Sequence, residues 1–381
     1  MLAELLARLT GVALFEYISF RAAMAALTAF ALALALGGPA IRWLRRHRVG
    51  EDVTKTAARE LAELSQRMGK HETTTMGGSF LVSSLLLSIL CWCELRNVAV
   101  LIAMVAVAGM AAVGFVDDYQ KLTVAKSRGL SERSKLLGQT IVSVACVGAL
   151  VWYARASGRF SLLELHPPFV KDWSLPLGET VLGSLVFVFL GWLVLAGTAN
   201  ATNITDGMDG LLAGCTVASG GALCVFCYVT GRSDWTEYLN LPYVPEAAEM
   251  AVVGAALVGA SLGFLWFNAF PASVFMGDSG SLPIGGLLGW MALVAKQELV
   301  LPLLGAVFFI ELGSSWLQRF WYKRSGGKRL FTMAPVHHGL QLKGGIFRPG
   351  PKPWHEVTVV VRAWIIAAVC ATASLALMKV R

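Results

Sequence analysis

Five short polar clusters interrupt an otherwise apolar chain and hold most of its acids, amides and histidines. They comprise residues 70–78, 117–121, 200–210, 268–281 and 333–343. Carboxylates are costly to place beside apolar membrane segments, so a gathering of them indicates a functional site. These residue types suit the handling of phosphates, a nucleoside and a divalent cation.

The first acids end a long apolar segment. Asp117 and Asp118 stand side by side, and Lys121 shares their face if the helix continues outward. Adjacent carboxylates repel each other, so either one takes up a proton or both face a cation such as Mg²⁺. The alternative is a solvated helix end in which Lys121 is a simple ion-pair partner. These residues alone do not decide between the two.

The densest cluster runs from residue 200 to residue 210. Its amides and acids recur at every third position, which brings neighbours onto one helical face: Asn200, Asn203, Asp206 and Asp209. Gly207 and Gly210 permit a tight turn in which backbone amides approach a ligand. An ordinary capped loop needs one such polar residue. Four of them favour contacts to a nucleoside's hydroxyls and to a metal's water shell.

The fourth cluster presents a single carboxylate in a flexible frame. Asp278 stands between Gly277 and Ser279-Gly280 and is suited to face a cation. Phe275 precedes it by three residues. The ring either stacks on a base or packs inside the protein, and the sequence leaves both open.

Two histidines, His337 and His338, follow Met333-Ala334-Pro335 in the fifth cluster. Consecutive side chains diverge and no cysteine is near, so a shared zinc ion is not expected. Phosphate contact or acid–base chemistry suits the pair better, because histidine titrates near neutral pH. Together the clusters predict Mg²⁺-assisted phosphoryl transfer from a nucleotide at a membrane surface.

The composition indicates which elements must position these residues. The chain has 381 residues, of which 56% are hydrophobic and only 15% charged, against about 25% charged in soluble domains. Apolar runs of bilayer length recur throughout, which predicts an all-α, polytopic integral membrane protein with one domain over residues 1–381. We expect about ten spanning helices, the second and eighth short or glycine-broken. Their centres lie near residues 28, 86, 106, 145, 188, 220, 257, 288, 308 and 368.

The distribution of basic residues predicts how the spans are oriented. Connections of odd number hold 21 Lys and Arg residues, and those of even number hold six. Positive residues favour the cytoplasmic side, so we expect both termini in the periplasm and all five clusters facing the cytoplasm. The net charge of +8 agrees with this bias and with attraction to anionic membrane lipids, and some cations are expected to handle a polyanionic substrate. No nucleic-acid partner is expected. All seven cysteines lie in apolar runs, so no disulfide framework is expected either.

Four of the clusters together resemble a specific family. Their sequences are Asp-Asp-x-x-Lys at 117–121, Asn-Ala-x-Asn-x-Thr-Asp-Gly-x-Asp-Gly at 200–210, Phe-Met-Gly-Asp-x-Gly-Ser at 275–281 and Met-Ala-Pro-x-His-His at 333–338. In this combination the chain resembles the phospho-N-acetylmuramoyl-pentapeptide transferases, which belong to the polyprenyl-phosphate N-acetylhexosamine-1-phosphate transferases. The resemblance implies transfer of phospho-MurNAc-pentapeptide from UDP-MurNAc-pentapeptide to undecaprenyl phosphate, giving lipid I and UMP for peptidoglycan synthesis. It also implies Mg²⁺ as cofactor and the bacterial inner membrane as location.

The same resemblance implies roles for individual residues. Asp278 would bind Mg²⁺ together with Asp117, and Asp117 and Asp118 would form the catalytic pair, with Asp117 as base or nucleophile. The nucleoside and substrate-binding residues would be Lys70, Thr75, Lys121, Asp206, Gly207, Met208, Asp209 and Asn268, with Phe275 stacked on uracil. Asn203, His337 and His338 would contact phosphates or support catalysis. The ninth span would be fragmented, and because homodimers occur in the family, self-association is left open.

The chain departs from the family pattern in its loops. Gly339 stands where a third histidine is usual, and Gln341 stands where a glutamate is usual. Glu72 and Thr74 depart from the usual residues of the segment after Lys70. These differences leave open the role of the histidine loop and the geometry near Lys70, and they raise the alternative of a pseudoenzyme. They do not affect the acids.

Two further functions compete with this expectation. A sibling enzyme would move GlcNAc-1-phosphate from UDP-GlcNAc to a polyprenyl phosphate, but such relatives usually carry Asp at the position of Lys121 and lack the Ala-Pro-x-His-His segment. A lipid or solute transporter would place acids near mid-span and show inverted repeats. Here the acids gather at the ends of the spans, which favours the transferase.

Overall fold

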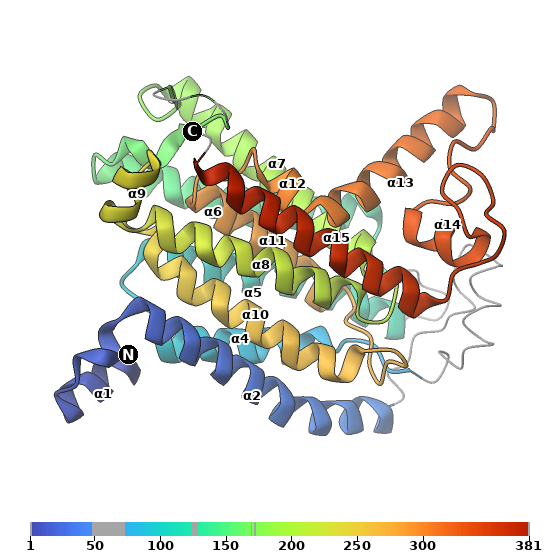
Figure 1. The fold of residues 1–381 in the computed structure, drawn as a ribbon, viewed down its shortest axis with the longest axis horizontal. Helices are drawn as coiled ribbons and strands as arrows, with labels where there is room; N and C mark the ends of the chain where they lie inside the picture. The colour runs from blue at the N-terminus through green and yellow to red at the C-terminus, as the bar shows by residue number, and fades with distance from the viewer. Residues whose placement is uncertain (1, 48–72, 124–128, 169, 171–172, 380–381) are drawn as a thin grey trace.

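The computed structural model describes the chain over residues 2–47, 73–123, 129–168, 170 and 173–379. Helices dominate this part of the chain, as expected for an all-α membrane protein (Figure 1). The long helices are α2 (Ile18–Arg46), α4 (Gly78–Trp92), α5 (Val98–Thr123), α6 (Glu132–Ala156), α7 (Val181–Thr205), α8 (Leu211–Thr230), α10 (Ala247–Asn268), α11 (Asp278–Val294), α13 (Ala306–Arg324) and α15 (Glu356–Ala376).

Shorter elements lie between and around these helices. The short helices are α1 (Leu2–Thr10), α9 (Ser233–Leu239), α12 (Leu301–Leu304) and α14 (Val336–Lys343), together with the 3₁₀ turns η1 (Ala13–Glu16), η4 (Phe160–Leu163) and η5 (Leu377–Lys379). The strands β1 (Glu164–Leu165) and β2 (Leu175–Pro176) form a two-residue antiparallel ladder, in which Glu164 is opposite Pro176. None of these short elements was expected from the spacing of apolar residues in the sequence, because each buries too little apolar surface to impose a repeating pattern.

Each of the ten expected span centres falls within a helix, but fewer helices qualify as spans by themselves. Within the described residues, seven are long and apolar enough to cross a membrane: α2, α5, α6, α7, α8, α10 and α15. Helices α4 and α11 have only 15 and 17 residues, and α13 ends in a run of charged and aromatic residues. The structure therefore supports a polytopic membrane protein, while the count of ten spans stays a prediction.

Helix α11 lies at the centre of the bundle, and each of its 17 residues is buried. It packs mainly on α5 and α7 and also contacts α4 and α8. We expected this segment to be short or glycine-broken; it is short, with 17 residues, and the helix is continuous. The glycines instead permit close packing: a Cβ on Gly285 would lie 2.2 Å from Thr202 Oγ1 on α7. Small residues at such positions let membrane helices approach closely.

The ninth expected span begins in two pieces. Helices α12 and α13 meet at Gly305, and α13 then points away from the bundle toward the loop that carries α14 (Figure 1). Its exposed side chains are largely aromatic or apolar and include Ile310, Trp316 and Phe320, which are 52%, 70% and 61% exposed. In a bilayer such side chains would face lipid.

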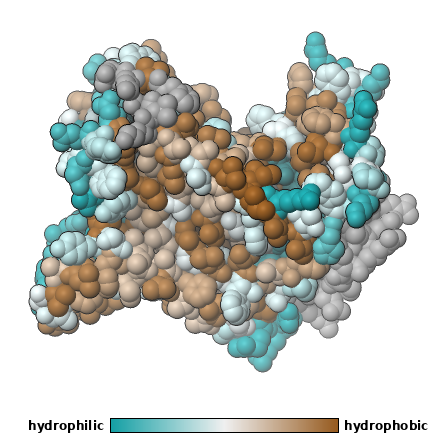
Figure 2. All heavy atoms as spheres, viewed as in Figure 1, coloured by the Kyte–Doolittle hydropathy of each residue, from teal (hydrophilic) through white to brown (hydrophobic). Residues whose placement is uncertain are grey.

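The two ends of the bundle differ in what they carry. Both chain termini lie at one end, and α14 lies at the other, where α7 and α10 also finish (Figure 1). Figure 2, drawn in the same view as Figure 1, shows apolar side chains across the middle of the molecule and hydrophilic ones gathered toward its two ends. The polar clusters that the structure describes occupy the α14 end, so the expected gathering on one face is supported by the fold.

Gly114 determines how closely α5 and α11 approach where the acids lie. A Cβ at this position would be 2.1 Å from the carbonyl oxygen of Asp278 and 2.6 Å from the nitrogen of Ser279. Both are backbone atoms at the start of α11 and cannot rotate away. Only glycine allows the end of α5 to lie directly against the first turn of α11.

We therefore expect Gly114→Ala to force the two helices apart and to lower thermal stability, since overpacking a tight contact costs about 1–3 kcal/mol. The unfolding temperature of the detergent-solubilised protein would measure this effect. Gly148→Ala on α6 is the matched control, because nothing lies within 4 Å of the Cβ position there. An equal melting temperature for wild type and Gly114→Ala would contradict the packing argument.

Candidate active site

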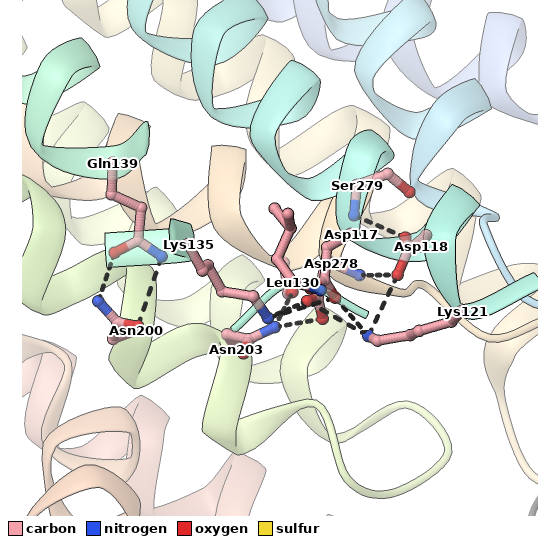
Figure 3. A network of polar contacts seen from close by, with 11 residues as sticks. Asp117, Asp118, Lys121, Leu130, Lys135, Gln139, Asn200, Asn203, Asp278 and Ser279 are labelled. Atoms are coloured by element: carbon pink, nitrogen blue, oxygen red, sulfur yellow. Dashed lines mark hydrogen bonds and ion pairs between the residues drawn. The ribbon is translucent and has the colours of Figure 1, made fainter. Parts of the chain in front are cut away.

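Three carboxylates from distant parts of the sequence meet at the α14 end of the bundle. Asp117 and Asp118 belong to the last turns of α5, and Asp278 is the first residue of α11 (Figure 3). One oxygen of each lies within 4.8 Å of those of the other two. All three residues are buried, with exposures of 1%, 2% and 7%. The structure thus brings together the acids that the sequence singled out.

Two lysines neutralise most of this negative charge. Lys121 Nζ lies 2.7 Å from Asp117 Oδ2, 3.5 Å from Asp118 Oδ1 and 3.4 Å from Asp278 Oδ2. Lys135 Nζ, near the start of α6, lies 3.4 Å from Asp117 Oδ2 and also pairs with Asp278 Oδ2. Lys121 was expected at the site. Lys135 was counted only as a basic loop residue, and its sequence neighbours give no signal of its role.

Backbone amides fix the orientation of two of the acids. The N–H groups of Asp278 and Ser279 donate to the two oxygens of Asp118, at 3.2 and 2.9 Å. These are free amides at the N-terminus of α11, which favours a negative charge there. The Leu130 N–H donates to Asp117 Oδ1 at 2.7 Å. Asp117 Oδ2 remains directed at the two lysine ammonium groups.

Asn203 belongs to this acid cluster and does not stand apart from it. Its Nδ2 donates to Asp278 Oδ1 at 2.7 Å and to Ser281 Oγ at 2.9 Å. One helical turn earlier on α7, Asn200 and Gln139 exchange amide hydrogen bonds, which join α7 to α6 (Figure 3). The three-residue spacing noticed in the sequence therefore lines Asn200 and Asn203 along the face of α7 that meets α6 and α11.

A second group of residues forms the 206–210 turn between α7 and α8. Gly207 is exposed at its tip, and Gly210 adopts a φ of +79°, which favours glycine. Asp209 is 3% exposed, and its Oδ2 accepts the N–H of Ala272 at 3.0 Å. Met208 is also buried, so its side chain packs in the core. Asp206 is half-buried and ends α7.

Asn268 and Glu356 hold this turn in place. Asn268 Oδ1 accepts the Gly210 N–H at 3.0 Å, and its Nδ2 donates to the Val274 carbonyl at 2.9 Å. Glu356 Oε1, at the start of α15, accepts the Asp209 N–H at 2.9 Å, while its Oε2 accepts from Gln341 Nε2 at 3.1 Å. Asn268 was expected beside a nucleoside; in this structure both of its amide atoms bind the backbone. Glu356 was not singled out from the sequence.

Phe275 lies in an extended segment that runs beside residues 74–78. Its N–H donates to the Thr74 carbonyl at 2.7 Å, and its carbonyl accepts the Gly77 N–H at 2.9 Å. Phe275 is half-buried. Thr75 Oγ1 lies close to Gly277, 3.2 Å from the position of a Cβ there, and so borders the acid cluster. Lys70, the other residue predicted for this region, lies outside the described residues.

The two histidines lie against the 206–210 turn. We expected their side chains to diverge, but the rings of His337 and His338 lie 4.1 Å apart at an angle of 61°. Both rings reach the 206–210 turn: a Cβ on Gly207 would lie 2.4 Å from His337 Nε2 and 3.3 Å from His338 Nε2. His337 is 2% exposed and His338 is half-buried. Glu311 on α13 lies beside His337 and was not anticipated from the sequence.

The acid cluster has the chemistry of a divalent-cation site. Three carboxylates with oxygens within 4.8 Å offer the hard donors that Mg²⁺ prefers. Asp117 Oδ2 is buried and faces the ammonium groups of Lys121 and Lys135 at 2.7 and 3.4 Å, so its position already suits a positive charge. The lysines beside it suit phosphate oxygens. The residues present therefore fit Mg²⁺ together with a phosphorylated substrate.

Comparison with known proteins places these residues in a family context. Residues 100–296 match the family model described as glycosyl transferase family 4. The chain is 40% identical over 380 residues to a phospho-N-acetylmuramoyl-pentapeptide-transferase from Maridesulfovibrio salexigens. That alignment covers 100% of this chain and 99% of the relative.

Proposed function

Because the chain belongs to the phospho-N-acetylmuramoyl-pentapeptide-transferase family, within glycosyl transferase family 4, we propose that it makes lipid I. It transfers phospho-MurNAc-pentapeptide from UDP-MurNAc-pentapeptide to undecaprenyl phosphate and releases UMP. The convergence of Asp117, Asp118 and Asp278 to within 4.8 Å beside Lys121 and Lys135 carries the proposal. Carboxylates can accept a proton or hold a metal ion, and ammonium groups can hold phosphates.

Asp117 acts on the acceptor in this proposal. Its Oδ1 is held by the Leu130 N–H, so Oδ2 is the oxygen presented to a reacting group. Oδ2 takes the proton of the lipid phosphate, whose oxygen then attacks the β-phosphorus of the donor as UMP leaves. Lys121 and Lys135 stabilise the phosphate oxygens as charge redistributes. A direct attack of this kind needs little activation of the nucleophile, because a phosphate dianion is already charged.

Asp278, with Asp117, would hold Mg²⁺, and the ion would neutralise negative charge on the donor pyrophosphate. Asn203 positions Asp278 through its 2.7 Å hydrogen bond. Asp118 is bound to two amides at the start of α11 and keeps that turn against α5. The three neighbouring acids thus have different roles in this proposal.

The assay that tests this function uses purified protein, Mg²⁺, UDP-MurNAc-pentapeptide and undecaprenyl phosphate, with UMP as the measured product. We expect release of UMP that requires the lipid phosphate. UMP release with UDP-GlcNAc but not with the muramyl donor would instead support the GlcNAc-1-phosphate transferase. No UMP with either donor would reject the proposed activity.

Phe275 stacks on the uracil ring of the donor in this proposal. Its half-buried ring is held by backbone hydrogen bonds on both sides, to Thr74 and Gly77. Base–aromatic stacking contributes about 1–3 kcal/mol, so we expect Phe275→Ala to raise the donor KM by about 5- to 150-fold with a smaller change in kcat. Phe189→Ala on α7, at a ring that is 57% exposed on the bundle surface, is the control. An unchanged donor KM in Phe275→Ala would exclude stacking.

We place the enzyme in the bacterial inner membrane with about ten spans, both termini in the periplasm and the site facing the cytoplasm. This placement rests on the basic residues of the odd connections and on the position of the acid cluster at the end away from the termini. A membrane-impermeant thiol reagent tests it on single-cysteine variants of a cysteine-free chain. Protection of a terminal cysteine in intact spheroplasts would contradict the orientation. A homodimer stays a prediction that sedimentation in detergent can address.

A further inference from the structure

Glu311 is a buried carboxylate that the proposed reaction does not use. It lies on α13, is 5% exposed, and packs beneath the loop that carries α14. Its Oε2 lies 3.2 Å from Nδ1 of His337 and 3.4 Å from the His337 backbone N–H, which donates to it. A buried carboxylate requires a compensating charge or donor. In the described part of the chain, His337 is the basic side chain within ion-pair distance of it.

The opposite side of the same ring points to the 206–210 turn. A Cβ on Gly207 would lie 2.4 Å from His337 Nε2, so a side chain at 207 would occupy the space in front of this nitrogen. Nδ1 and Nε2 are both buried, and neither makes an aligned hydrogen bond with the described residues. Gly207 itself is exposed. An oxygen atom that reaches the turn from solvent can therefore become the acceptor that the protein does not provide.

We infer that Glu311 is a positioning residue that holds His337 as an imidazolium with Nδ1 toward the carboxylate and Nε2 toward Gly207, where Nε2–H binds a phosphate oxygen of the nucleoside diphosphate donor. Oε2 lies beside both Nδ1 of the ring and the backbone N–H of His337, so one carboxylate oxygen faces the two groups. The inference rests on the proposed function for the identity of the donor. Through Glu311, helix α13 would then contact the residues that bind the donor phosphates, although the apolar side chains of this helix face outward.

The test compares Glu311→Gln, Glu311→Asp, His337→Gln and the Glu311→Gln/His337→Gln double variant in the full-length, purified chain. The first measurement is UDP binding by calorimetry, which does not depend on the sugar or the lipid. We expect Glu311→Gln and His337→Gln each to weaken UDP binding by about tenfold, and the double variant to be no weaker than the worse single variant, because the two residues act as one unit. Glu311→Asp keeps the charge and should retain most of the affinity.

The second measurement is UMP release, which separates this inference from the function it rests on. We expect kcat to fall by about 10- to 100-fold in Glu311→Gln, and by more than the donor KM rises, because charge on the departing phosphate grows in the transition state. If the wild type binds UDP but releases no UMP, the proposed function fails, and the UDP results still decide the role of Glu311.

Glu249→Gln provides the matched control for loss of a buried acid. Glu249 is also 5% exposed, pairs with Arg21, and lies in the first turn of α10, at the other end of that helix from Asn268. We expect its UDP affinity and kcat to stay within about twofold of wild type, with melting temperatures reported for every variant. The inference is overturned if His337→Gln loses UDP affinity while Glu311→Gln does not. It is equally overturned if the two losses multiply in the double variant.

Discussion

Asp278→Ala is expected to lower UMP release by about 10³-fold or more, because it removes a carboxylate that would hold the divalent cation. Lys121, Lys135 and Asn203 all contact this carboxylate. Without it, the ammonium groups of Lys121 and Lys135 lose a negative charge that offsets their mutual repulsion. The divalent cation also loses an oxygen ligand. The steady-state rate at saturating donor and lipid measures the loss, and Mg²⁺ titration should show weaker apparent activation.

Asp234→Ala serves as the control for removal of an acid outside the site. Its side chain is 58% exposed, lies in α9 and pairs with Arg232 at 2.7 Å. This variant should retain wild-type activity. If Asp278→Ala kept full activity with an unaltered Mg²⁺ requirement, the assignment of Asp278 to the metal would be wrong.

Asp117→Asn should lower kcat by about 10²–10⁴-fold, which is the usual contribution of a positioned general base. Asparagine preserves the size of the side chain, so the N–H of Leu130 keeps an acceptor while the basic oxygen near Lys121 is lost. Because Asp117 would also hold Mg²⁺ with Asp278, a higher Mg²⁺ concentration should be needed for half-maximal activity. Excess Mg²⁺ should not restore the rate, since the missing step is proton removal.

Rapid-quench analysis separates the direct attack from a two-step path. The wild type, mixed with donor and Mg²⁺ but no lipid phosphate, should release no stoichiometric burst of UMP. A burst accompanied by a phosphosugar bound to the protein would show that a carboxylate attacks first. In that case Asp117 would be a nucleophile and direct attack would have to be abandoned.

The fold class could be predicted from the sequence because membrane insertion imposes a simple pattern. Long apolar runs must form helices, since a bilayer leaves no partner for unpaired backbone groups. Each of the ten expected centres therefore lies in a helix. The number of true spans could not be obtained in the same way, because α11 is buried by its neighbours on all sides and carries the pattern of a core helix.

Several residues of the candidate site could also be picked out from the sequence, by residue type and by their immediate neighbours. Asp117, Asp118, Asp278 and Asn203 stood out because acids and amides are rare among apolar residues, and the structure places all four together. Lys135, Glu311 and Glu356 did not stand out. Each lies among ordinary loop or helix residues. Its place in the site depends on a contact with a residue that is distant in the sequence. The shortest of these separations is 15 residues, between Glu356 and Gln341.

The sequence by itself determined that this is a helical membrane protein, and it singled out the acids, amides and histidines that we propose carry its chemistry. Both properties follow from residue type and short-range spacing. Only the tertiary structure decided that Lys135 neutralises Asp278, that Glu311 faces His337, and that Asn268 holds the backbone of the 206–210 turn. These pairings depend on how closely glycines such as Gly114 let the helices pack, and packing distance is a property of the assembled bundle.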